Sequence, residues 1–230
     1  MRSSRTWFID LTKRISWNWT FGGTKKERGL ARTGLGAAYM SEYTEIERRF
    51  FVNGEGDKPW REDGDPTSIR QFYLDKGQLV FSESELIYGG AAIARLNEEE
   101  RVLFQSEKDW TVRVRFRDDR TVFTLKGRRT NASAIELEWP IERALGEALV
   151  SLEEYPRVEK TRYEWRGSDG MLWEIDEFEG GLLGLVLAEI ELQNIEQPVE
   201  LPEWVQLEIT GNLAWSNSNL AYRSSRIILD

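Results

Sequence analysis

The sequence contains neither cysteine nor histidine. Without cysteine there is no disulfide framework, no thiol nucleophile and no cysteine-ligated zinc site. Without histidine, catalysis by a Ser-His-Asp triad and histidine-ligated zinc are excluded as well. The groups that remain for chemistry are carboxylates, the cations of Lys and Arg, hydroxyls, and metals that accept oxygen ligands, such as Mg²⁺ or Mn²⁺.

Long apolar runs are also absent. No stretch of about 18 apolar residues occurs, so we expect no membrane-spanning helix. The apolar residues near the N-terminus are interrupted by Asp10, Lys13 and Arg14, which is not the pattern of a secretory signal. With 40% hydrophobic and 31% charged residues, the 230-residue chain has the composition of a globular protein. We therefore expect a cytoplasmic protein that does not act at a membrane.

Positive charge is scarce over most of the chain. The net charge of −9 argues against a nucleic-acid-binding protein, whose surface is normally basic. Residues 1–39 hold eight Lys or Arg and two Asp or Glu, a net charge of +6, which leaves −15 for residues 40–230. We expect residues 1–39 to be a basic tail that is either disordered or upstream of a natural start at Met40. The alternative is a basic arm or a targeting segment.

Charged residues alternate with apolar residues in several short segments. In the first, Glu45, Glu47 and Arg49 stand at every second position, and alternate side chains of a strand share one face. The same layout recurs in the pairs Arg113/Arg115, Glu136/Glu138, Lys160/Arg162, Glu174/Asp176 and Glu189/Glu191. Charges that face solvent on an ordinary sheet would also explain these segments, and from the residues alone this arrangement stays open. The dense mixture of both signs over about eight strands also suits a closed barrel with a charged interior.

These patterns also predict where the elements lie. Alternation predicts strands at 45–52, 69–74, 110–116, 122–126, 134–139, 157–165, 171–178 and 184–192. Apolar residues at helical spacing predict an amphipathic helix over 141–155, which ends before Pro156. Between the second and third strands, 78–81 and 85–88 predict a hairpin, and 97–100 reads as a charged loop. A short helix is expected at 198–204.

Taken together, the charged segments resemble the CYTH superfamily, the triphosphate tunnel metalloenzymes. Residues Glu45 to Phe50 are similar to the family's ExExK signature, with Arg49 where the family usually has Lys. Further matches follow in the family's order over residues 43–222: Ile69 to Leu74, Val112 to Arg115, Leu125 to Gly127, Glu159 to Tyr163, Trp173 to Asp176, Leu187 to Glu191 and Trp215 to Asn217. Residues 75–109 are an insertion where the family has a hairpin turn.

The resemblance implies a mainly β (α+β) domain over residues 40–230, an eight-stranded antiparallel β-barrel or tunnel with a few outer helices. It implies that interior cations bind phosphate oxygens: Arg49, Arg113, Arg115, Lys126, Lys160 and Arg162. It also implies that Mg²⁺ or Mn²⁺ is held by members of an acidic set: Glu45, Glu47, Glu136, Glu138, Asp176, Glu189 and Glu191. Lys160 and Tyr73 are the candidate catalytic groups.

The activity implied is metal-dependent hydrolysis of a small anionic triphosphate by a chain that could pair as a homodimer. We expect inorganic tripolyphosphate, cleaved to pyrophosphate and phosphate, because the motifs supply charges but no element that would bind a base. Tyr88 or Phe81 of the insertion could supply such an element. The alternatives are a class IV-type adenylate cyclase, a thiamine triphosphatase, or a polyphosphate-binding module without turnover.

Overall fold

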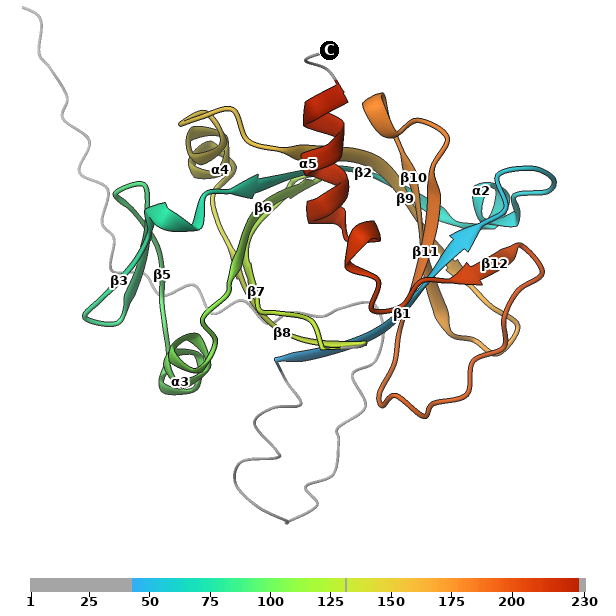
Figure 1. The fold of residues 1–230 in the computed structure, drawn as a ribbon, viewed down its shortest axis with the longest axis horizontal. Helices are drawn as coiled ribbons and strands as arrows, with labels where there is room; N and C mark the ends of the chain where they lie inside the picture. The colour runs from blue at the N-terminus through green and yellow to red at the C-terminus, as the bar shows by residue number, and fades with distance from the viewer. Residues whose placement is uncertain (1–42, 131, 228–230) are drawn as a thin grey trace, which may run out of the picture. The chain divides into compact units, whose positions relative to one another are not determined.

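Eight strands pair antiparallel into a closed ring, visible as the circle of ribbons in Figure 1. The computed structural model describes residues 43–130 and 132–227. The strands follow one another around the ring in the order β1, β11, β10, β9, β2, β6, β7, β8 and again β1. Their bounds are Thr44–Val52 (β1), Asp65–Leu74 (β2), Thr111–Arg117 (β6), Arg120–Lys126 (β7), Ser133–Pro140 (β8), Arg157–Arg166 (β9), Leu172–Phe178 (β10) and Val186–Glu191 (β11). The predicted eight-stranded antiparallel barrel is confirmed.

Strand β1 closes the ring because it pairs on both of its edges. Glu45 lies opposite Ala134 of β8, and Glu47 lies opposite Glu191 of β11. The short strand β12 (Val205–Glu208) pairs with the end of β1, beyond the residues that pair with β8. It covers backbone groups that would otherwise form a free strand edge.

The expectations for residues 1–39 concern a part of the chain outside the described residues. Within residues 43–130 and 132–227, no helix is long and apolar enough to cross a membrane. Helices in this part of the chain are few, as predicted, and together with the insertion they pack on the barrel.

The apolar face of β6, β7 and β8 points outward and is covered by α4 (Arg143–Val150). Leu149 of α4 is buried there beside Phe116 and Phe123. Gly146 allows the close approach of this helix, since a Cβ atom at that position would lie 2.5 Å from the Thr121 side chain. The predicted helix over 141–155 is thus confirmed with tighter bounds.

The insertion packs on the same outer face. It forms a three-stranded sheet, β3 (Leu79–Ser82), β4 (Glu85–Tyr88) and β5 (Ala91–Arg95), followed by α3 (Glu98–Ser106). Its buried side chains belong to the same apolar cluster as β6 and β7: Leu86, Tyr88, Leu96 and Leu103. The predicted hairpin is confirmed, and the insertion extends the outer core beside the ring (Figure 1).

The expectation of a charged loop at 97–100 is wrong, because these residues begin helix α3. The Asn97 side chain accepts a hydrogen bond from the Glu100 backbone N–H at 2.9 Å, and Glu100 accepts one from the Asn97 N–H at 2.8 Å. This reciprocal pair is a capping box, and acidic residues in a first helical turn are favoured by the helix dipole. The acidic run is therefore a helix start.

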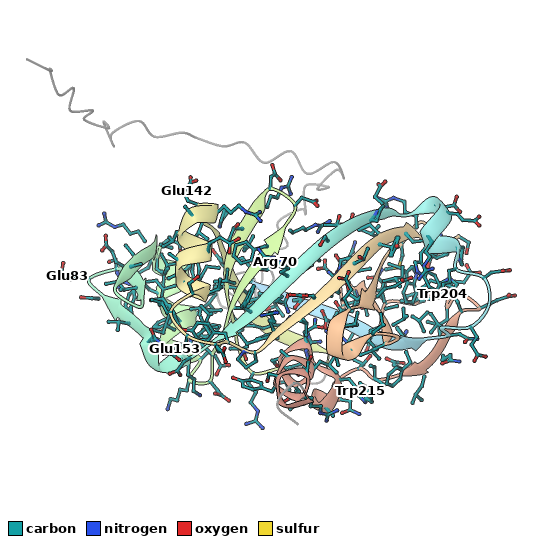
Figure 2. The ribbon with its side chains drawn as sticks, turned by 90° about the horizontal axis from the view of Figure 1, so that it is seen from above. Arg70, Glu83, Glu142, Glu153, Trp204 and Trp215 are labelled. Carbon is teal, nitrogen blue, oxygen red and sulfur yellow. The ribbon has the colours of Figure 1, made fainter. Side chains whose placement is uncertain are left out.

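The outer face of β9, β10 and β11 is covered by a tryptophan cluster, on the other side of the barrel from α4 (Figure 2). The ring of Trp204 lies 5.1 Å from that of Trp60 in α2 (Pro59–Asp63) and 5.5 Å from those of Trp165 and Trp173. The helix expected at 198–204 is wrong, since this segment is irregular. Pro202 would remove a hydrogen bond from such a helix and disfavours helical backbone at the residue before it.

One end of the barrel is covered by α5 (Asn217–Ile227) and the preceding turn η3 (Leu213–Trp215), which lie across the ring in Figure 1. Leu220 of α5 is buried with Tyr73 and Phe178. The Arg49 guanidinium donates a hydrogen bond to the carbonyl of Trp215 at 2.9 Å. This helix was not predicted, because its Asn and Ser residues have low helix propensity.

We predict that Leu86→Ala destabilises the whole domain by about 2–5 kcal/mol, because it leaves a cavity in the core shared by the insertion and the barrel. Val80→Ala in the same insertion is the control, since Val80 is 51% exposed and its loss should change stability by less than about 0.5 kcal/mol. Urea denaturation monitored by tryptophan fluorescence measures both. Equal stabilities for the two variants would contradict the shared core.

Candidate active site

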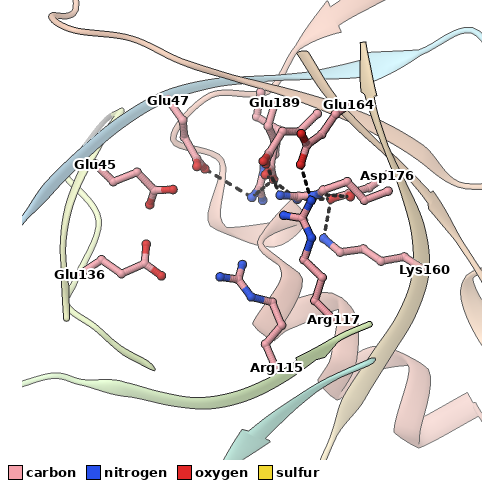
Figure 3. A network of polar contacts seen from close by, with 12 residues as sticks. Glu45, Glu47, Arg115, Arg117, Glu136, Lys160, Glu164, Asp176 and Glu189 are labelled. Atoms are coloured by element: carbon pink, nitrogen blue, oxygen red, sulfur yellow. Dashed lines mark hydrogen bonds and ion pairs between the residues drawn. The ribbon is translucent and has the colours of Figure 1, made fainter. Parts of the chain in front are cut away.

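The inner face of the barrel carries the charged side chains that the alternation predicted (Figure 3). Residues between them, such as Val114, Leu137 and Ile175, are buried in the outer clusters, so the charged positions face inward. The cations are Arg49, Arg113, Arg115, Lys126, Lys160 and Arg162. The acids are Glu45, Glu47, Glu136, Glu138, Asp176, Glu189 and Glu191. The structure thus places every predicted charged site residue on one inner surface.

The most buried group is the ion pair of Lys160 with Asp176, which are 2% and 0% exposed. Arg162 grips the same carboxylate with two nitrogens, each 2.7 Å from an Asp176 oxygen. Burial would raise the pKa of Asp176, but the Arg162 and Lys160 cations outweigh it and hold that pKa below its ordinary value. Burial lowers the pKa of Lys160 to about 8, against the opposing attraction of Asp176. This lysine can therefore gain or lose a proton near neutral pH.

Arg49 connects β1 to β11 and to the covered end. Its Nη2 atom forms an ion pair with Glu189 and lies 3.4 Å from Glu47 Oε1. Burial would raise the pKa of Glu189, but Arg49 and Arg162 outweigh it and hold the carboxyl ionised. Where the family usually has Lys, this chain thus uses a guanidinium that contacts two carboxylates and the Trp215 carbonyl at once.

On the opposite wall, Arg113 is held by three acceptors. Its Nη2 atom lies 2.6 Å from Glu136 Oε1, 3.0 Å from Glu138 Oε1 and 3.1 Å from Thr124 Oγ1. Arg115 Nη2 reaches the same Glu138 oxygen at 3.0 Å. Burial and then repulsion from Arg113 lower the pKa of Arg115. Because Arg113 and Arg115 share one carboxylate oxygen, further N–H donors of these two guanidinium groups can bind an anion.

Glu45 and Glu136 point toward each other between these walls (Figure 3). Burial, and next the negative charge of Glu136, raise the pKa of Glu45 well above its ordinary value. Burial would also raise the pKa of Glu136, but the cations of Lys126 and Arg113 lower it. Lys126 contacts both carboxylates. The pKa values of the two facing carboxyl groups are thus pushed apart, with that of Glu45 raised and that of Glu136 lowered.

Glu191 lies at the exposed end of β11, and no ion pair found in the described part of the chain includes it. Burial and the nearby carboxylates of Glu174, Glu47 and Glu136 raise its pKa. Glu174 itself pairs with Arg162. Carboxyl groups are thus crowded around Glu45, Glu47 and Glu191.

Tyr73 lies at the covered end. Its ring packs in the cluster under α5, and its hydroxyl accepts a hydrogen bond from the Gln71 side chain. Burial raises the pKa of Tyr73 to about 12, although the nearby Arg113 acts in the opposite direction. Tyr73 therefore keeps its proton and can act as a hydrogen-bond donor, not as a base.

Sequence reasoning missed some members of this network. Arg117 pairs with Glu164, and both stand at the period-two spacing of charges already found, so extending the pattern would have included them. Arg129 reaches Glu47 from the loop between β7 and β8. No alternation marks a loop residue, so the sequence carried no signal for Arg129.

The donor chemistry of the interior suits a hard divalent cation. Its acceptors are oxygen atoms, and burial together with neighbouring carboxylates raises the pKa of Glu45 and Glu191, so an added positive charge would stabilise their ionised forms. In residues 43–130 and 132–227, no three acidic side chains lie close enough together to hold a metal ion in the present arrangement. Lys and Arg side chains lie between them. A hollow of about 460 Å³ lies elsewhere, outside the barrel beside Trp165 and Leu201. The charged side chains of the interior are joined to one another by ion pairs.

Removing the charge of either glutamate of β11 should change the stability of the domain by different amounts. We predict that Glu189→Gln costs about 3–5 kcal/mol of stability, because it removes a buried partner of Arg49 and Arg162. Glu191→Gln should cost nothing at neutral pH. Its pKa is raised in the folded state, so the ionised carboxylate lowers stability as pH rises above its ordinary pKa of about 4.3. Urea denaturation at pH 7.5, without metal, measures both, and a loss in Glu191→Gln would contradict the placement.

Comparisons with known proteins agree with this geometry. The family model described as the CYTH domain matches residues 102–224. An inorganic triphosphatase of Acetivibrio thermocellus is 43% identical over 117 residues, which are 50% of this chain and 73% of that protein. An inorganic triphosphatase of Nitrosomonas europaea is 35% identical over 115 residues, 48% of this chain and 76% of that protein. A crystal structure of an inorganic triphosphatase superposes with a TM-score of 0.49 at 27% identity, covering 77% of this chain and 93% of the other. The family-model match and the two relatives, together with the barrel and its interior of both charge signs, show that the chain is a member of the CYTH family.

Proposed function

We propose that this chain hydrolyses inorganic tripolyphosphate to pyrophosphate and phosphate with the help of Mg²⁺ or Mn²⁺. The observation that carries the proposal is the closed barrel whose interior holds paired cations and acids, in a CYTH chain 43% identical to a protein named as an inorganic triphosphatase. A triphosphate is the small linear anion that could exchange partners with many of these cations at once.

The cations bind the phosphate oxygens. Arg113 and Arg115 share the acceptor Glu138 and so can each turn an N–H donor toward a phosphate. Arg162 and Arg49 are held rigid by Asp176 and Glu189, which orients their remaining donors. Together with Lys126 they neutralise the charge of the phosphoryl group that is transferred, and Lys160 adds a positive charge once it has accepted a proton.

The acids divide into two groups. Asp176, Glu189 and Glu138 are engaged by arginines and serve to position them. Glu45 and Glu47, with Glu136 and Glu191 nearby, would hold the divalent cation, since these carboxylates crowd one another. When bound, such a cation supplies Lewis-acid stabilisation of phosphate oxygens and activation of water.

Lys160 is the candidate for proton transfer. Its pKa of about 8 leaves both protonation states populated near neutral pH, which suits a group that accepts a proton from the attacking water. Asp176 and Arg162 fix its position. Tyr73, which keeps its own proton, would orient the water or a phosphate oxygen by donating a hydrogen bond.

The preference for an inorganic substrate follows from where the aromatic side chains lie. Tyr88 is 0% exposed in the outer core, and Phe81 packs against Phe104 of α3, so the insertion offers neither as a stacking surface. Trp139 and Trp173 also pack in the outer clusters. Recognition of a nucleobase or thiazolium ring would need such a group at the barrel interior.

We therefore predict that kcat/KM is higher for tripolyphosphate than for ATP or thiamine triphosphate when all three are assayed with Mg²⁺. Chelation by EDTA should abolish phosphate release, and added Mg²⁺ or Mn²⁺ should restore it. A kcat/KM for ATP or thiamine triphosphate equal to or above that for tripolyphosphate would contradict the substrate assignment. Full activity in EDTA would contradict the role of the metal.

We also predict that kcat/KM rises with pH through about 8, as Lys160 loses its proton. Lys160→Arg keeps the positive charge but removes the titration, so its profile should be flat there and its kcat lower by about 10²–10⁴-fold. Lys126→Arg is the matched control, because Lys126 is held as a cation between Glu45 and Glu136. Its pH profile should keep the rise. A rise that persists in Lys160→Arg assigns the proton transfer to another group.

A further inference from the structure

Arg129 is the interior cation that comes from a loop. It follows β7, in the turn that leads to β8. Its Nη2 atom lies 2.6 Å from Glu47 Oε1 and 3.8 Å from Glu45 Oε2, and its side chain is 15% exposed. A guanidinium from outside the strand pattern thus bridges the two acids of β1.

The contact with Arg129 supplies the positive charge that the buried Glu47 carboxylate requires. It is only 3% exposed, and its other cationic neighbour, Arg49, is farther away at 3.4 Å from the same oxygen. A buried carboxylate without a close cation would be strongly disfavoured. Arg129 is therefore the main counter-charge of Glu47.

The same position is where a divalent cation would bind. Glu45 and Glu47 are acids of the crowded group, and a metal bound to Glu47 would take the oxygen that Arg129 now contacts. Two guanidinium groups can share one carboxylate oxygen, as Arg113 and Arg115 share Glu138 Oε1. A divalent cation carries twice the charge and binds its oxygen ligand at about 2.0–2.1 Å, so it would repel a guanidinium nitrogen that lies 2.6 Å from the same oxygen more strongly. Binding of the metal at Glu47 therefore opposes the contact with Arg129.

We propose that Arg129 is a resident counter-cation of the metal site: the divalent cation displaces it from Glu47, and the freed guanidinium then binds the triphosphate. The proposal rests on the proposed function for the identity of the metal and the anion. Arg129 borders a small hollow of about 20 Å³ together with Arg49 and Ser216, so its side chain is not packed on every side. Its loop position allows this movement, whereas strand cations such as Arg162 are fixed by several partners.

The proposal predicts that removing Arg129 changes the affinities for the metal and for the triphosphate in opposite directions. Removal of Arg129 removes a competitor of the metal, so metal should bind more tightly. It also removes a donor for phosphate, so the anion should bind more weakly. A purely structural arginine would weaken both.

The test uses the full chain and Mn²⁺, whose free concentration is measured by electron paramagnetic resonance without substrate. Arg129→Gln should bind Mn²⁺ about fivefold or more tightly than the unaltered protein. Arg128→Gln is the matched control, because Arg128 is the exposed neighbour in the same loop and the charge change is identical. It should leave the affinity unchanged. Glu47→Gln should abolish the tight site and so verify where Mn²⁺ binds.

Calorimetric binding of tripolyphosphate at saturating Mn²⁺, which frees Arg129 from Glu47, gives the second readout. It is carried out in the Lys160→Arg background, in which hydrolysis is slow, and there Arg129→Gln should bind the anion more weakly than Arg128→Gln. The proposal is overturned if Arg129→Gln binds Mn²⁺ no more tightly than Arg128→Gln, or if anion binding is the same in both. Should Arg129→Gln not fold, Arg129→Lys, which keeps the charge but loses the planar fork, must show intermediate shifts of the same signs. Neither readout measures hydrolysis, so loss of the proposed activity and loss of the Arg129 switch are distinguishable.

Discussion

The structure depends on the mutual neutralisation of opposite charges inside a closed barrel. Groups such as Lys160, Arg162 and Asp176 are almost completely removed from water, and an isolated charge in such a place would be prohibitively unfavourable. Each is tolerated because its neighbour across the strands has the opposite sign. Strand register is therefore as important to the interior as side-chain identity: a shift of one residue would turn the charged face outward and the apolar face inward.

This arrangement also explains why the outer surface of the barrel is so apolar. With charges inside, the intervening residues of each strand must be covered on the outside. Helix α4 and the insertion cover one side, the tryptophans around Trp204 cover the other, and α5 covers an end. The insertion is thus an extension of a core that the barrel already required, and the exposed acids at the far end of the interior remain open to solvent.

Much of this could be predicted from the sequence, and the reason is the period of two. Alternation fixes which residues share a face, so the inner position of Glu45, Lys160 and the other charged residues followed from spacing once the sheet was taken as closed. What could not be predicted depends on packing or on single backbone positions. Helix α5 is polar in sequence and is formed by its contacts with the barrel end. Residues 198–204 are kept irregular by Pro202, and Asn97 turns an acidic loop into a helix start. Arg129 lies in a loop where no period applies, and the raised pKa of Glu45 depends on its burial and on the nearness of Glu136 on the neighbouring strand β8.

The covering of one barrel end by α5 has a consequence for the symmetry of what can bind. Under the proposed function, a linear anion would enter through the uncovered end, with one terminus toward Lys160 and the other toward Glu191. The two termini of tripolyphosphate are identical, so every encounter along the barrel axis is correctly oriented. A molecule with a bulky group at one terminus can bind in one direction only. If it enters with the other terminus first, it must dissociate before it can bind correctly.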